Sequence, residues 1–165
     1  MEVNMYSFRQ AELKDLNKIA EIEKKCFSKE EGASLCSFKE RFARFSECFF
    51  VVEVDEKIVG HINGCIYDTP ELPDELYSDP SLHSPDGKYQ TVFGLAVDPD
   101  FQGNGYASLL IKHFIEMSKM RQHKGIVLTC KDHLINFYQN FGFKHLGKSD
   151  SNHGGVNWND MLLTF

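Results

Sequence analysis

The segment from Val97 to Leu110, which reads VDPDFQGNGYASLL, constrains the fold of this chain more than any other stretch. A mostly apolar run ends at a proline, two glycines follow, and an apolar helical stripe begins. Four apolar residues recur at helical spacing and predict the inner face of that helix: Ala107, Leu110, Ile111 and Phe114. The segment therefore predicts a strand, a tight turn and a helix in succession, the repeating unit of α/β domains.

Apolar runs and chain breakers predict the other elements around this unit. Short apolar runs bounded by polar residues predict strands, and apolar residues three and four apart predict helices. The expected order is β-α-α-β-β-β-α-β-α-β-β, an α/β or α+β domain around a mixed sheet. We expect strands near residues 3–9, 48–54, 57–67, 88–98, 125–130, 143–146 and 157–164, and helices near 13–27, from 37, after the glycine turn, and from 132 to 141.

Local signals mark where some of these elements begin and end. Ser37 and Glu40 form an S-x-x-E capping box, which predicts the start of the second helix. Asp132 can cap the last helix, and Gly142 is typical of a helix C-terminus. The pair Asp55-Glu56 predicts the tight turn of a hairpin.

Length and composition bound the class of protein. A chain of 165 residues with 42% hydrophobic and 25% charged residues predicts a single globular domain, residues 1–165, that needs no disulfide or structural metal to fold. No apolar run approaches the length of a membrane span, and the N-terminus lacks the layout of a signal peptide. We therefore expect a soluble, cytoplasmic protein without a membrane partner.

Charge and side-chain chemistry argue against further classes. The net charge of −6 and the lack of a Lys/Arg run argue against nucleic-acid binding. The five cysteines are irregularly spaced and include no C-x-x-C pair, which predicts reduced thiols. The seven histidines are scattered without metal-ligand spacing, so we expect no metal.

Residues 68–87 interrupt the regular pattern. Four of the five prolines and six acidic residues fall in this stretch. A loop of this length inside a compact domain is usually functional or disordered. Two interpretations stay open: the acidic loop attracts a cationic amine, or it is a solvated charged surface.

The turn between Gln102 and Ser108 is a candidate phosphate site. Backbone N–H groups at a helix start lack partners within the helix, and the helix dipole places positive potential behind them. Glycines let the backbone approach an anion closely, so an acidic chain needs no lysine cluster to bind a polyphosphate. Glycine pairs also occur in plain tight connections, and the segment has neither the Lys-Ser/Thr of a P-loop nor the dinucleotide spacing. Its combination with other segments sharpens the signal.

Three motifs together resemble the GNAT acetyltransferase superfamily. Gln102-x-x-Gly105-x-Ala107 is similar to the Q/R-x-x-G-x-G/A signature of its coenzyme A pyrophosphate loop. Phe8-Arg9-x-Ala11 resembles its first strand, and Asn136-Phe137-Tyr138 through Phe143 resembles its C-terminal aromatic element. The resemblance spans essentially the whole chain. It implies an acyl-CoA N-acyltransferase fold, with a mixed central sheet of about seven strands flanked by about four helices.

Further segments are similar to the arylalkylamine (serotonin) N-acetyltransferase branch of that superfamily. They include Glu23-x-x-Cys26-Phe27, Leu82-His83-x-Pro85 and Leu95-Ala96-Val97. In that branch two histidines on the central strand help to remove the proton of the amine, whereas Thr91 and Phe93 stand at these positions here. The proton route and the natural acceptor therefore stay open.

The resemblance also implies roles for individual residues. Tyr138 would protonate the departing thiolate as general acid. For the base the chain offers only candidates, which are His83, His61, Glu53 through a water, or an ordered water chain without a single base, and His83 is kept as the candidate catalytic residue. The acetyl carbonyl and coenzyme arm would bind beside Gly94, along residues 95–97. The expected coenzyme-binding residues are Leu95, Ala96, Val97, Gln102, Gly103, Asn104, Gly105, Tyr106, Ala107, Ser108, Asn136 and Phe137, and the expected acceptor contacts are Phe27, Leu35 and Phe93.

The leading hypothesis is an N-acetyltransferase that moves an acetyl group from acetyl-CoA to the primary amine of a small molecule, arylalkylamine- or polyamine-like, in a ternary complex. Desolvation of the ammonium and alignment of the two reactants would supply much of the rate advantage. Cys130 has no His/Asn arrangement to activate it, so we expect core packing for this thiol. Two alternatives remain: acetylation of a protein or peptide, and a coenzyme A-binding sensor without catalysis. Either a monomer or a homodimer is compatible with the sequence.

Overall fold

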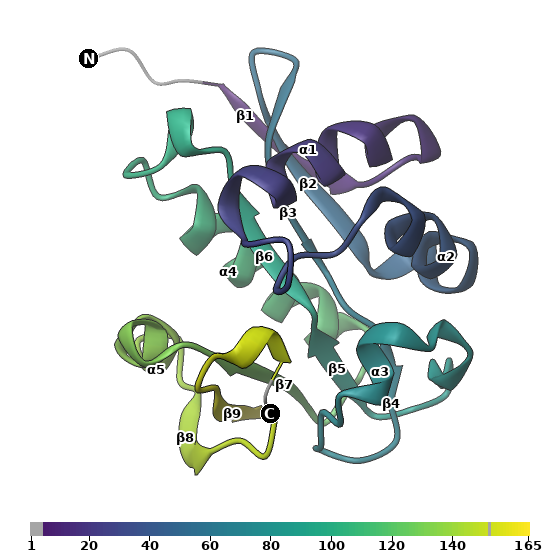
Figure 1. Cartoon of the computed structure of the whole chain (residues 1–165), viewed down its shortest axis with the longest axis vertical. Coiled ribbons are helices and arrows are strands. Elements are labelled where there is room, and N and C mark those ends of the chain that lie inside the picture. Colours follow the sequence, from purple (N-terminus) through teal and green to yellow (C-terminus); the bar gives the residue numbers. More distant parts are fainter. Residues whose placement is uncertain (1–4, 152) are drawn as a thin grey trace. The chain divides into compact units, whose positions relative to one another are not determined.

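Figure 1 shows the computed structural model of the chain, in which residues 5–151 and 153–165 are described. The described chain forms two compact units. The first takes its described residues from the stretch up to Asn63 and from Gly94–Phe114, and the second comprises Gly64–Phe93 and Ile115–Phe165. The first two residues of the strand predicted at 3–9 lie outside the described residues.

The first unit is built on an antiparallel four-stranded sheet in the order β1-β2-β3-β6. The tight turn predicted at Asp55-Glu56 is confirmed, since both residues have positive φ, 51° and 66°, between the two central strands. This turn geometry matches the twist of a two-residue hairpin. The strands are β1 (Tyr6–Gln10), β2 (Phe49–Val54), β3 (Lys57–Asn63) and β6 (Gly94–Val97).

Two helices, α1 (Leu16–Cys26) and α2 (Leu35–Phe45), cover one face of this sheet (Figure 1). Phe38 on α2 packs edge-on against Phe49 of β2 and His61 of β3, with ring centroids 6.4 and 5.7 Å apart. Their buried aromatic and aliphatic side chains form the core on this face. The Phe38 ring therefore packs α2 against the sheet.

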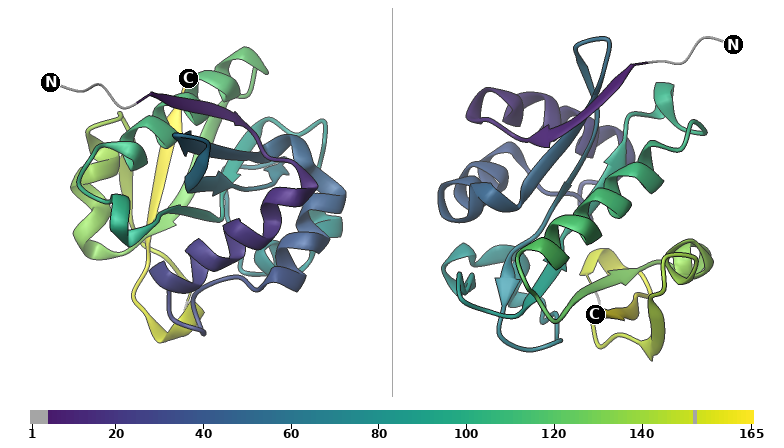
Figure 2. Two further views of the ribbon diagram at one scale, coloured as in Figure 1. Left: turned by 90° about the horizontal axis from the view of Figure 1, so that it is seen from above. Right: turned by 180° about the vertical axis from the view of Figure 1, so that it is seen from behind.

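The opposite face of the sheet is covered by the first part of α4 (Tyr106–Met120), which the view from behind shows crossing the strands (Figure 2). Phe114 packs edge-on against Phe50 at 5.9 Å, and His113 stacks on Phe8 at 4.6 Å. Leu110, Ile111 and Phe114 are almost completely buried, as the helical spacing predicts.

The second unit is built on a mixed five-stranded sheet in the order β4-β5-β7-β9-β8. The β5–β7 pair is parallel and the other pairs are antiparallel. The strands are β4 (Ile66–Tyr67), β5 (Tyr89–Val92), β7 (Gly125–Cys130), β8 (Lys144–Lys148) and β9 (Asn159–Thr164). The last turns of α4, α3 (Glu75–Ser78) and α5 (Ile135–Gln139) belong to this unit.

Two predicted strands are each divided between the two sheets. The stretch 57–67 splits into β3 and β4, and the stretch 88–98 splits into β5 and β6. A Cβ atom at Gly64 would lie 1.9 Å from the carbonyl oxygen of Thr91, so this close backbone approach requires glycine. The neighbouring Cys65 N–H donates to Thr91 Oγ1 at 2.9 Å. Apolar periodicity cannot reveal such a break, because the residues on both sides of it remain strand-like.

The helix ends correct two predicted caps. Ser34, not Ser37, caps α2, because the Ser37 N–H donates to Ser34 Oγ at 3.1 Å. Asp132 lies inside the turn that precedes α5, and its Oδ1 accepts a hydrogen bond from Asn159 Nδ2 at 2.7 Å. Gly142 has φ +98°, which confirms it as the residue that ends the last helix.

The predicted α/β class with a mixed sheet is confirmed. Within the described residues the strands number nine, in two sheets, and the α-helices five, where about seven strands and about four helices were expected. The stretch 68–87 is largely irregular but contains α3 and a short 3-10 turn at Pro80–Leu82. None of the described helices combines the length and the apolar character that a membrane crossing requires.

Candidate active site

The glycine turn that precedes α4 has the geometry expected of an anion site. Gly103 and Gly105 have φ values of +82° and +85°, a region that residues with a side chain rarely adopt. A Cβ atom at either glycine would meet nothing within 4 Å, so the demand for glycine is conformational and the surface in front of the turn is open. Residues 102–105 are exposed.

Side-chain hydrogen bonds hold this turn in shape. Gln102 Nε2 donates to the carbonyl oxygen of Val97 at 3.0 Å, and Cys26 Sγ donates to the same oxygen at 3.1 Å. Asn104 Nδ2 donates to the carbonyl oxygen of Phe101 at 3.0 Å. The side chains of Gln102 and Asn104, predicted to bind the coenzyme, are thus used within the turn, and the backbone is what the turn presents outward.

A buried carboxylate anchors the start of the turn. Asp98 Oδ1 accepts a hydrogen bond from the Asp100 N–H at 3.0 Å, and Lys25 Nζ lies 3.5 Å from Asp98 Oδ2. The Asp100 N–H, together with Lys25, holds the pKa of Asp98 below its ordinary value, although burial opposes the shift. The Asp98 carboxylate therefore stays ionised at neutral pH, paired with a lysine.

The N-terminus of α4 follows the turn directly. Tyr106 is buried, while Ala107 and Ser108 are half-buried. The first N–H groups of a helix have no intrahelical acceptor, and the dipole of this 15-residue helix adds positive potential at that end. Turn and helix together can bind a phosphate group through backbone amides.

Strand β6 presents a backbone edge. It is the last strand in the order of its sheet, with β3 on one side. The Asp98 N–H donates to Val59 of β3 at 2.7 Å, so by the alternation of an antiparallel strand the backbone groups of Leu95 and Val97 point away from β3. This direction is the one required of a backbone donor to a carbonyl oxygen bound beside the strand.

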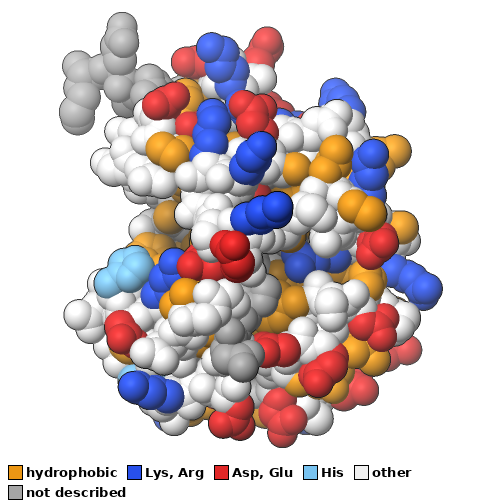
Figure 3. All heavy atoms as spheres, in the orientation of Figure 1, with side chains coloured by type: hydrophobic (Ala, Val, Ile, Leu, Met, Phe, Trp, Pro, Cys, Tyr) orange, Lys and Arg blue, Asp and Glu red, His pale blue; other side chains and the backbone are white. Residues whose placement is uncertain are grey.

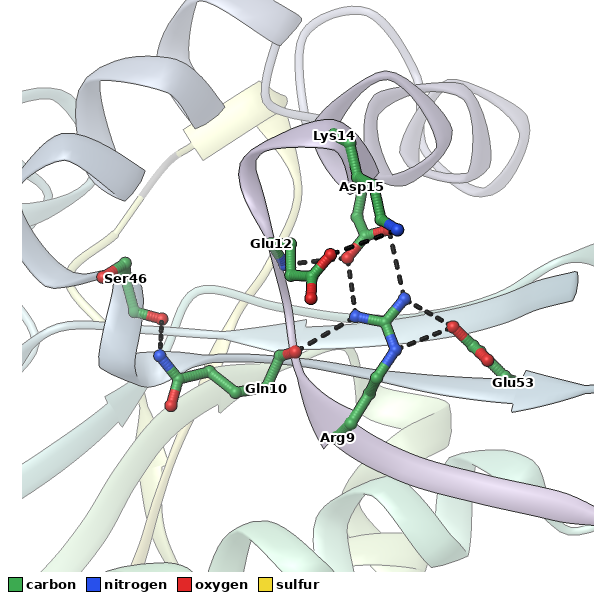
Figure 4. Close-up of polar contacts among 7 residues, drawn as sticks. All are labelled: Arg9, Gln10, Glu12, Lys14, Asp15, Ser46 and Glu53. Atoms are coloured by element: carbon green, nitrogen blue, oxygen red, sulfur yellow. Dashed lines mark hydrogen bonds and ion pairs between the residues drawn. The ribbon is translucent and has the colours of Figure 1, made fainter. Parts of the chain in front are cut away.

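Arg9, from the Phe8-Arg9-x-Ala11 motif, binds two carboxylates of the first unit (Figure 4). Its Nη1 lies 2.7 Å from Asp15 Oδ2, and its Nε donates to Glu53 Oε1 at 2.7 Å. Burial raises the pKa of Asp15, but hydrogen bonds from Arg9 and the Glu12 N–H outweigh burial and bring the pKa below its ordinary value. Since Glu53 is committed to Arg9, its carboxylate is poorly placed to act as a base through water.

The Glu23 carboxylate was given no role from sequence, although it lies on the buried stripe of α1 with Leu16 and Ile19. Its Oε1 is 3.2 Å from Nε2 of His61, which is completely buried. Its Oε2 accepts a hydrogen bond from the Ala33 N–H at 3.0 Å. A charged residue at an apolar position of a helix was the signal that could have found it.

In the second unit, Tyr138 is buried on α5 among aromatic rings. Phe137 and Phe143 lie edge-on to it, with centroids 5.0 and 5.6 Å away. Burial, with smaller contributions from the ionised forms of Cys130 and Tyr77, raises the pKa of the Tyr138 phenol above its ordinary value. The phenol is therefore fully protonated at neutral pH and can act as a proton donor.

Asn136 and Phe137, which were predicted to bind the coenzyme, precede Tyr138 in the chain. The Asn136 side chain is exposed, and the Phe137 ring also packs edge-on against Phe141, with centroids 5.3 Å apart. Burial raises the pKa of the Cys130 thiol to about 11. Cys130 is thus a protonated core thiol at neutral pH, which agrees with the packing role expected for it.

His83 is bonded within the second unit in a way that argues against a role as base. Its Nδ1 accepts a hydrogen bond from the Ile66 N–H at 3.0 Å. This bond engages the unprotonated ring nitrogen, so the proton of the neutral ring sits on Nε2. A base needs a free lone pair, and here the lone pair fixes the loop to β4.

The predicted acceptor residues divide between the two units. Phe27 and Leu35 are half-buried at the end of α1 and the start of α2, in the first unit. Phe93 belongs to the second unit, where its ring lies 4.8 Å from that of Tyr77.

The acidic stretch 68–87 borders a hollow in the second unit. Figure 3 shows acidic side chains gathered over this part of the surface, at the lower right. The hollow has a volume of about 520 Å³, and its lining includes Glu71, Asp74, Glu75, Asp150 and Asp160. Among the described residues no group of histidine, cysteine or carboxylate side chains is arranged to hold a metal ion.

Comparison with known families gives a match that covers most of the chain. The model of the family described as "Acetyltransferase (GNAT) family" matches residues 16–143.

Curated relatives are similar at moderate identity. The chain is 27% identical over 150 residues to L-2,4-diaminobutyric acid acetyltransferase of Vibrio parahaemolyticus, covering 90% of this chain and 72% of that protein. It is 30% identical over 92 residues to serotonin N-acetyltransferase of Mesocricetus auratus, covering 55% and 43%. It is 26% identical over 114 residues to human N-acetyltransferase 8B, covering 67% and 44%. The chain thus spans less than half the length of the last two proteins.

Solved structures of low identity share the fold over nearly the whole chain. The loading GNATL domain of CurA from Lyngbya majuscula superposes with a TM-score of 0.83 at 16% identity, covering 98% of both chains. The GphF GNAT-like decarboxylase in complex with isobutyryl-CoA gives 0.82 at 18% identity, covering 96% and 98%. A Brucella melitensis GNAT family acetyltransferase in complex with acetyl-CoA gives 0.64 at 17% identity, covering 99% and 90%. The predicted acyltransferase fold is confirmed.

Proposed function

The chain belongs to the GNAT acetyltransferase family, and from this premise we propose that it transfers the acetyl group of acetyl-CoA to the primary amine of a small molecule. Acetyl-CoA is the co-substrate, no metal takes part, and the reaction proceeds by direct attack of the amine on the thioester.

The observation that carries this proposal is the turn at residues 102–108. Two glycines with positive φ, an open surface and the start of α4 together suit a pyrophosphate, which a glycine-rich helix start binds through backbone amides. We assign the phosphate contacts to the backbone of Gly103 to Ser108, and we assign to Gln102 and Asn104 the task of holding the turn.

Two further assignments complete the reaction. The backbone N–H groups of β6, Leu95 foremost, stabilise the oxygen of the acetyl carbonyl as negative charge develops on it. Tyr138 donates a proton to the departing thiolate, a role supported by its protonated state at neutral pH and by the family resemblance of its motif. A buried phenol is a weak acid, so proton donation must accompany cleavage of the carbon–sulfur bond.

The class of acceptor is supported by the relatives. The names of two of them state small amines, serotonin and L-2,4-diaminobutyric acid, as their substrates. We propose an alkyl- or arylalkylamine of this size for the present chain, and we retain as predictions that residues 1–165 act as one cytoplasmic domain, as a monomer or a homodimer. The GphF decarboxylase shows that the fold also serves other chemistry on acyl-CoA, so transfer itself has to be tested.

Two measurements test the proposal in sequence. Calorimetry with coenzyme A and acetyl-CoA must detect binding; no heat from either molecule contradicts the assignment of the turn. Thiol release from acetyl-CoA is then followed with tryptamine, phenethylamine, spermidine, an aminoglycoside and a peptide as acceptors. Turnover with the amines supports the proposal, turnover with the peptide alone indicates a protein acetyltransferase, and tight binding without acceptor-dependent release indicates a sensor.

A further inference from the structure

A buried polar cluster of the first unit has a composition that packing alone does not explain. It brings together Glu23 of α1, His61 and Asn63 of β3, and Arg41 of α2. All four side chains are between 0% and 5% exposed. Burying a carboxylate, a guanidinium and two further polar groups is costly, so such clusters are most often paired in full or used in function.

The cluster is not paired in full. Arg41 Nη1 donates to Asn63 Oδ1 at 3.4 Å, and the Ala33 N–H donates to Glu23 Oε2 at 3.0 Å. Glu23 Oε1 and His61 Nε2 are 3.2 Å apart, at ion-pair distance but without the alignment of a hydrogen bond. Glu23 Oε1, His61 Nδ1 and Asn63 Nδ2 form no hydrogen bond with any described residue.

Two of these unsatisfied atoms, Glu23 Oε1 and Asn63 Nδ2, lie close to Gly94, the first residue of β6. Asn63 pairs with Gly94 across the sheet. A Cβ atom built on Gly94 would lie 3.5 Å from Glu23 Oε1 and 3.7 Å from Asn63 Nδ2. Because residue 94 has no side chain, a gap of about the size of a methyl group separates the strand from the Glu23 carboxylate. Next in the chain is Leu95, whose backbone the proposed function assigns to the acetyl carbonyl.

We propose that Glu23 is the group that binds the acceptor amine and takes its proton, with His61 as the positioning residue that shares this proton. The assignment rests on the proposed function, which supplies an ammonium ion that must lose a proton before it attacks. A carboxylate oxygen with no hydrogen-bond donor of its own, beside a glycine on β6, is the acceptor that an ammonium group requires.

The proton and bond balance is as follows. The acceptor enters as an ammonium ion, and one proton passes to the Glu23–His61 pair and then to water. The nitrogen lone pair forms a bond to the acetyl carbon, and the carbon–sulfur bond breaks. Tyr138 donates its phenolic proton to the sulfur, and the second proton lost by the nitrogen restores the phenol through solvent. The products are the amide, the free thiol of coenzyme A and one proton, without any change of oxidation state.

The test compares two acceptors of the same shape and different basicity. Phenethylamine, or the alkylamine of the panel that turns over fastest, is mostly an ammonium ion at pH 7, since such amines resemble lysine with a pKa of about 10.4. Its β,β-difluoro analogue is far less basic because fluorine withdraws electrons, so much more of it is already neutral. Glu23→Gln keeps the size of the side chain, and Glu21→Gln on the exposed side of the same helix is the matched control.

We expect Glu23→Gln to lower kcat/KM for the ammonium acceptor by about a hundredfold, the scale of general-base catalysis, and to change the difluoro analogue less than about tenfold. His61→Gln should also lower kcat/KM for the ammonium acceptor more than for the difluoro analogue, but by a smaller factor than Glu23→Gln. An equal loss with both acceptors, at unchanged coenzyme affinity, would show a structural role and overturn the assignment. Wild-type protein without turnover on any amine would instead overturn the proposed function.

A second variant keeps the test valid if Glu23→Gln fails to fold. Gly94→Ala places its methyl group at ordinary contact distances, 3.5 Å from the nearest atom, so the fold should tolerate it. The methyl group fills the gap beside Glu23, and KM for the amine should rise about tenfold or more, by a larger factor than the coenzyme Kd. An unchanged KM would exclude Gly94 as the entry point and overturn the proposal.

Discussion

The side-chain amide of Gln102 donates a hydrogen bond to the carbonyl oxygen of Val97 at 3.0 Å, and so ties the glycine turn to the strand that leads into it. The thiol of Cys26 on α1 donates to the same oxygen at 3.1 Å. The carbonyl oxygen of Val97 thus links the glycine turn, strand β6 and helix α1. The residue type that begins the family's loop motif is explained by this internal bond, which leaves the backbone amides available to a phosphate.

Replacement of Gly103 or Gly105 by alanine should weaken coenzyme binding. Each variant forces a side chain into positive φ, which costs about 1–2 kcal/mol in stability or distorts the turn. Gly147→Ala is a matched control, because Gly147 also has positive φ, +117°, with nothing near its Cβ position, and lies on β8. Calorimetry should show a raised coenzyme Kd for the two turn variants alone; a similar Kd in all three would contradict the phosphate assignment.

Gln102→Met should weaken coenzyme binding mildly. The variant keeps the length of the side chain but loses the donor to Val97, a hydrogen bond of about 1 kcal/mol, while the bond from Cys26 remains. We expect a coenzyme Kd raised less than about tenfold and little change in melting temperature. Gln102→Glu, which brings negative charge to the turn, should be clearly worse. Equal affinities for the two variants would argue against an anion at this turn.

Tyr138→Phe should slow the chemical step by about a hundredfold or more while the coenzyme Kd is preserved, because the ring remains packed and only the proton donor is lost. The measurement is single-turnover thiol release at saturating acetyl-CoA. Tyr67→Phe removes a phenol from β4 in the same unit and serves as the control. Turnover equal to that of the wild type would remove Tyr138 from the mechanism.

Asp15→Asn should destabilise the fold by about 1–3 kcal/mol, the scale of a hydrogen bond to a charged group, because it leaves Arg9 with one carboxylate instead of two. Since the native pKa of Asp15 is lowered, its ionisation stabilises the protein above the unfolded value of about 4, and this contribution disappears as the pH falls through the native value. Urea unfolding between pH 7 and pH 3 should therefore show a smaller loss for the variant than for the wild type.

The exposed pair Lys14–Glu12 provides the comparison for this experiment. Lys14→Gln should change stability by less than about 1 kcal/mol, because both side chains are solvated. If Asp15→Asn were as mild as Lys14→Gln, the buried bridge of Arg9 would not be the stabilising element that its geometry indicates.

The five thiols should differ widely in reactivity. Cys36 is exposed and should react first with an aromatic disulfide reagent at pH 8. Cys26 is half-buried, burial raises its pKa, and it should react slowly. Cys48, Cys65 and Cys130 are buried and should react only when the protein unfolds, since the pKa of Cys130 is also raised to about 11. Fast reaction of Cys130 in native protein would reopen the question of a thiol nucleophile.

The sequence alone determined the elements whose signal is local. Helical spacing located the buried face of α4, a glycine turn was predicted before it, and a tight turn was predicted at 55–56. The three motifs at residues 8–11, 102–107 and 136–143 were enough to predict the family and its fold, because each motif is a pattern of residues close together in the chain.

The tertiary structure decided what depends on contacts between distant residues. The division of the predicted strands at Gly64 and Phe93 follows from backbone approaches and sheet partners far along the chain. The same holds for the site: His83 lost its free lone pair to the Ile66 amide, and Glu23 gained a role because α1, β3 and β6 bring its carboxylate to His61 and Gly94. Helical periodicity shows that Glu23 faces inward, but only the packing of α1 on the sheet shows which groups it meets there. These neighbours decide its role, because burial removes the water that would otherwise solvate its charge.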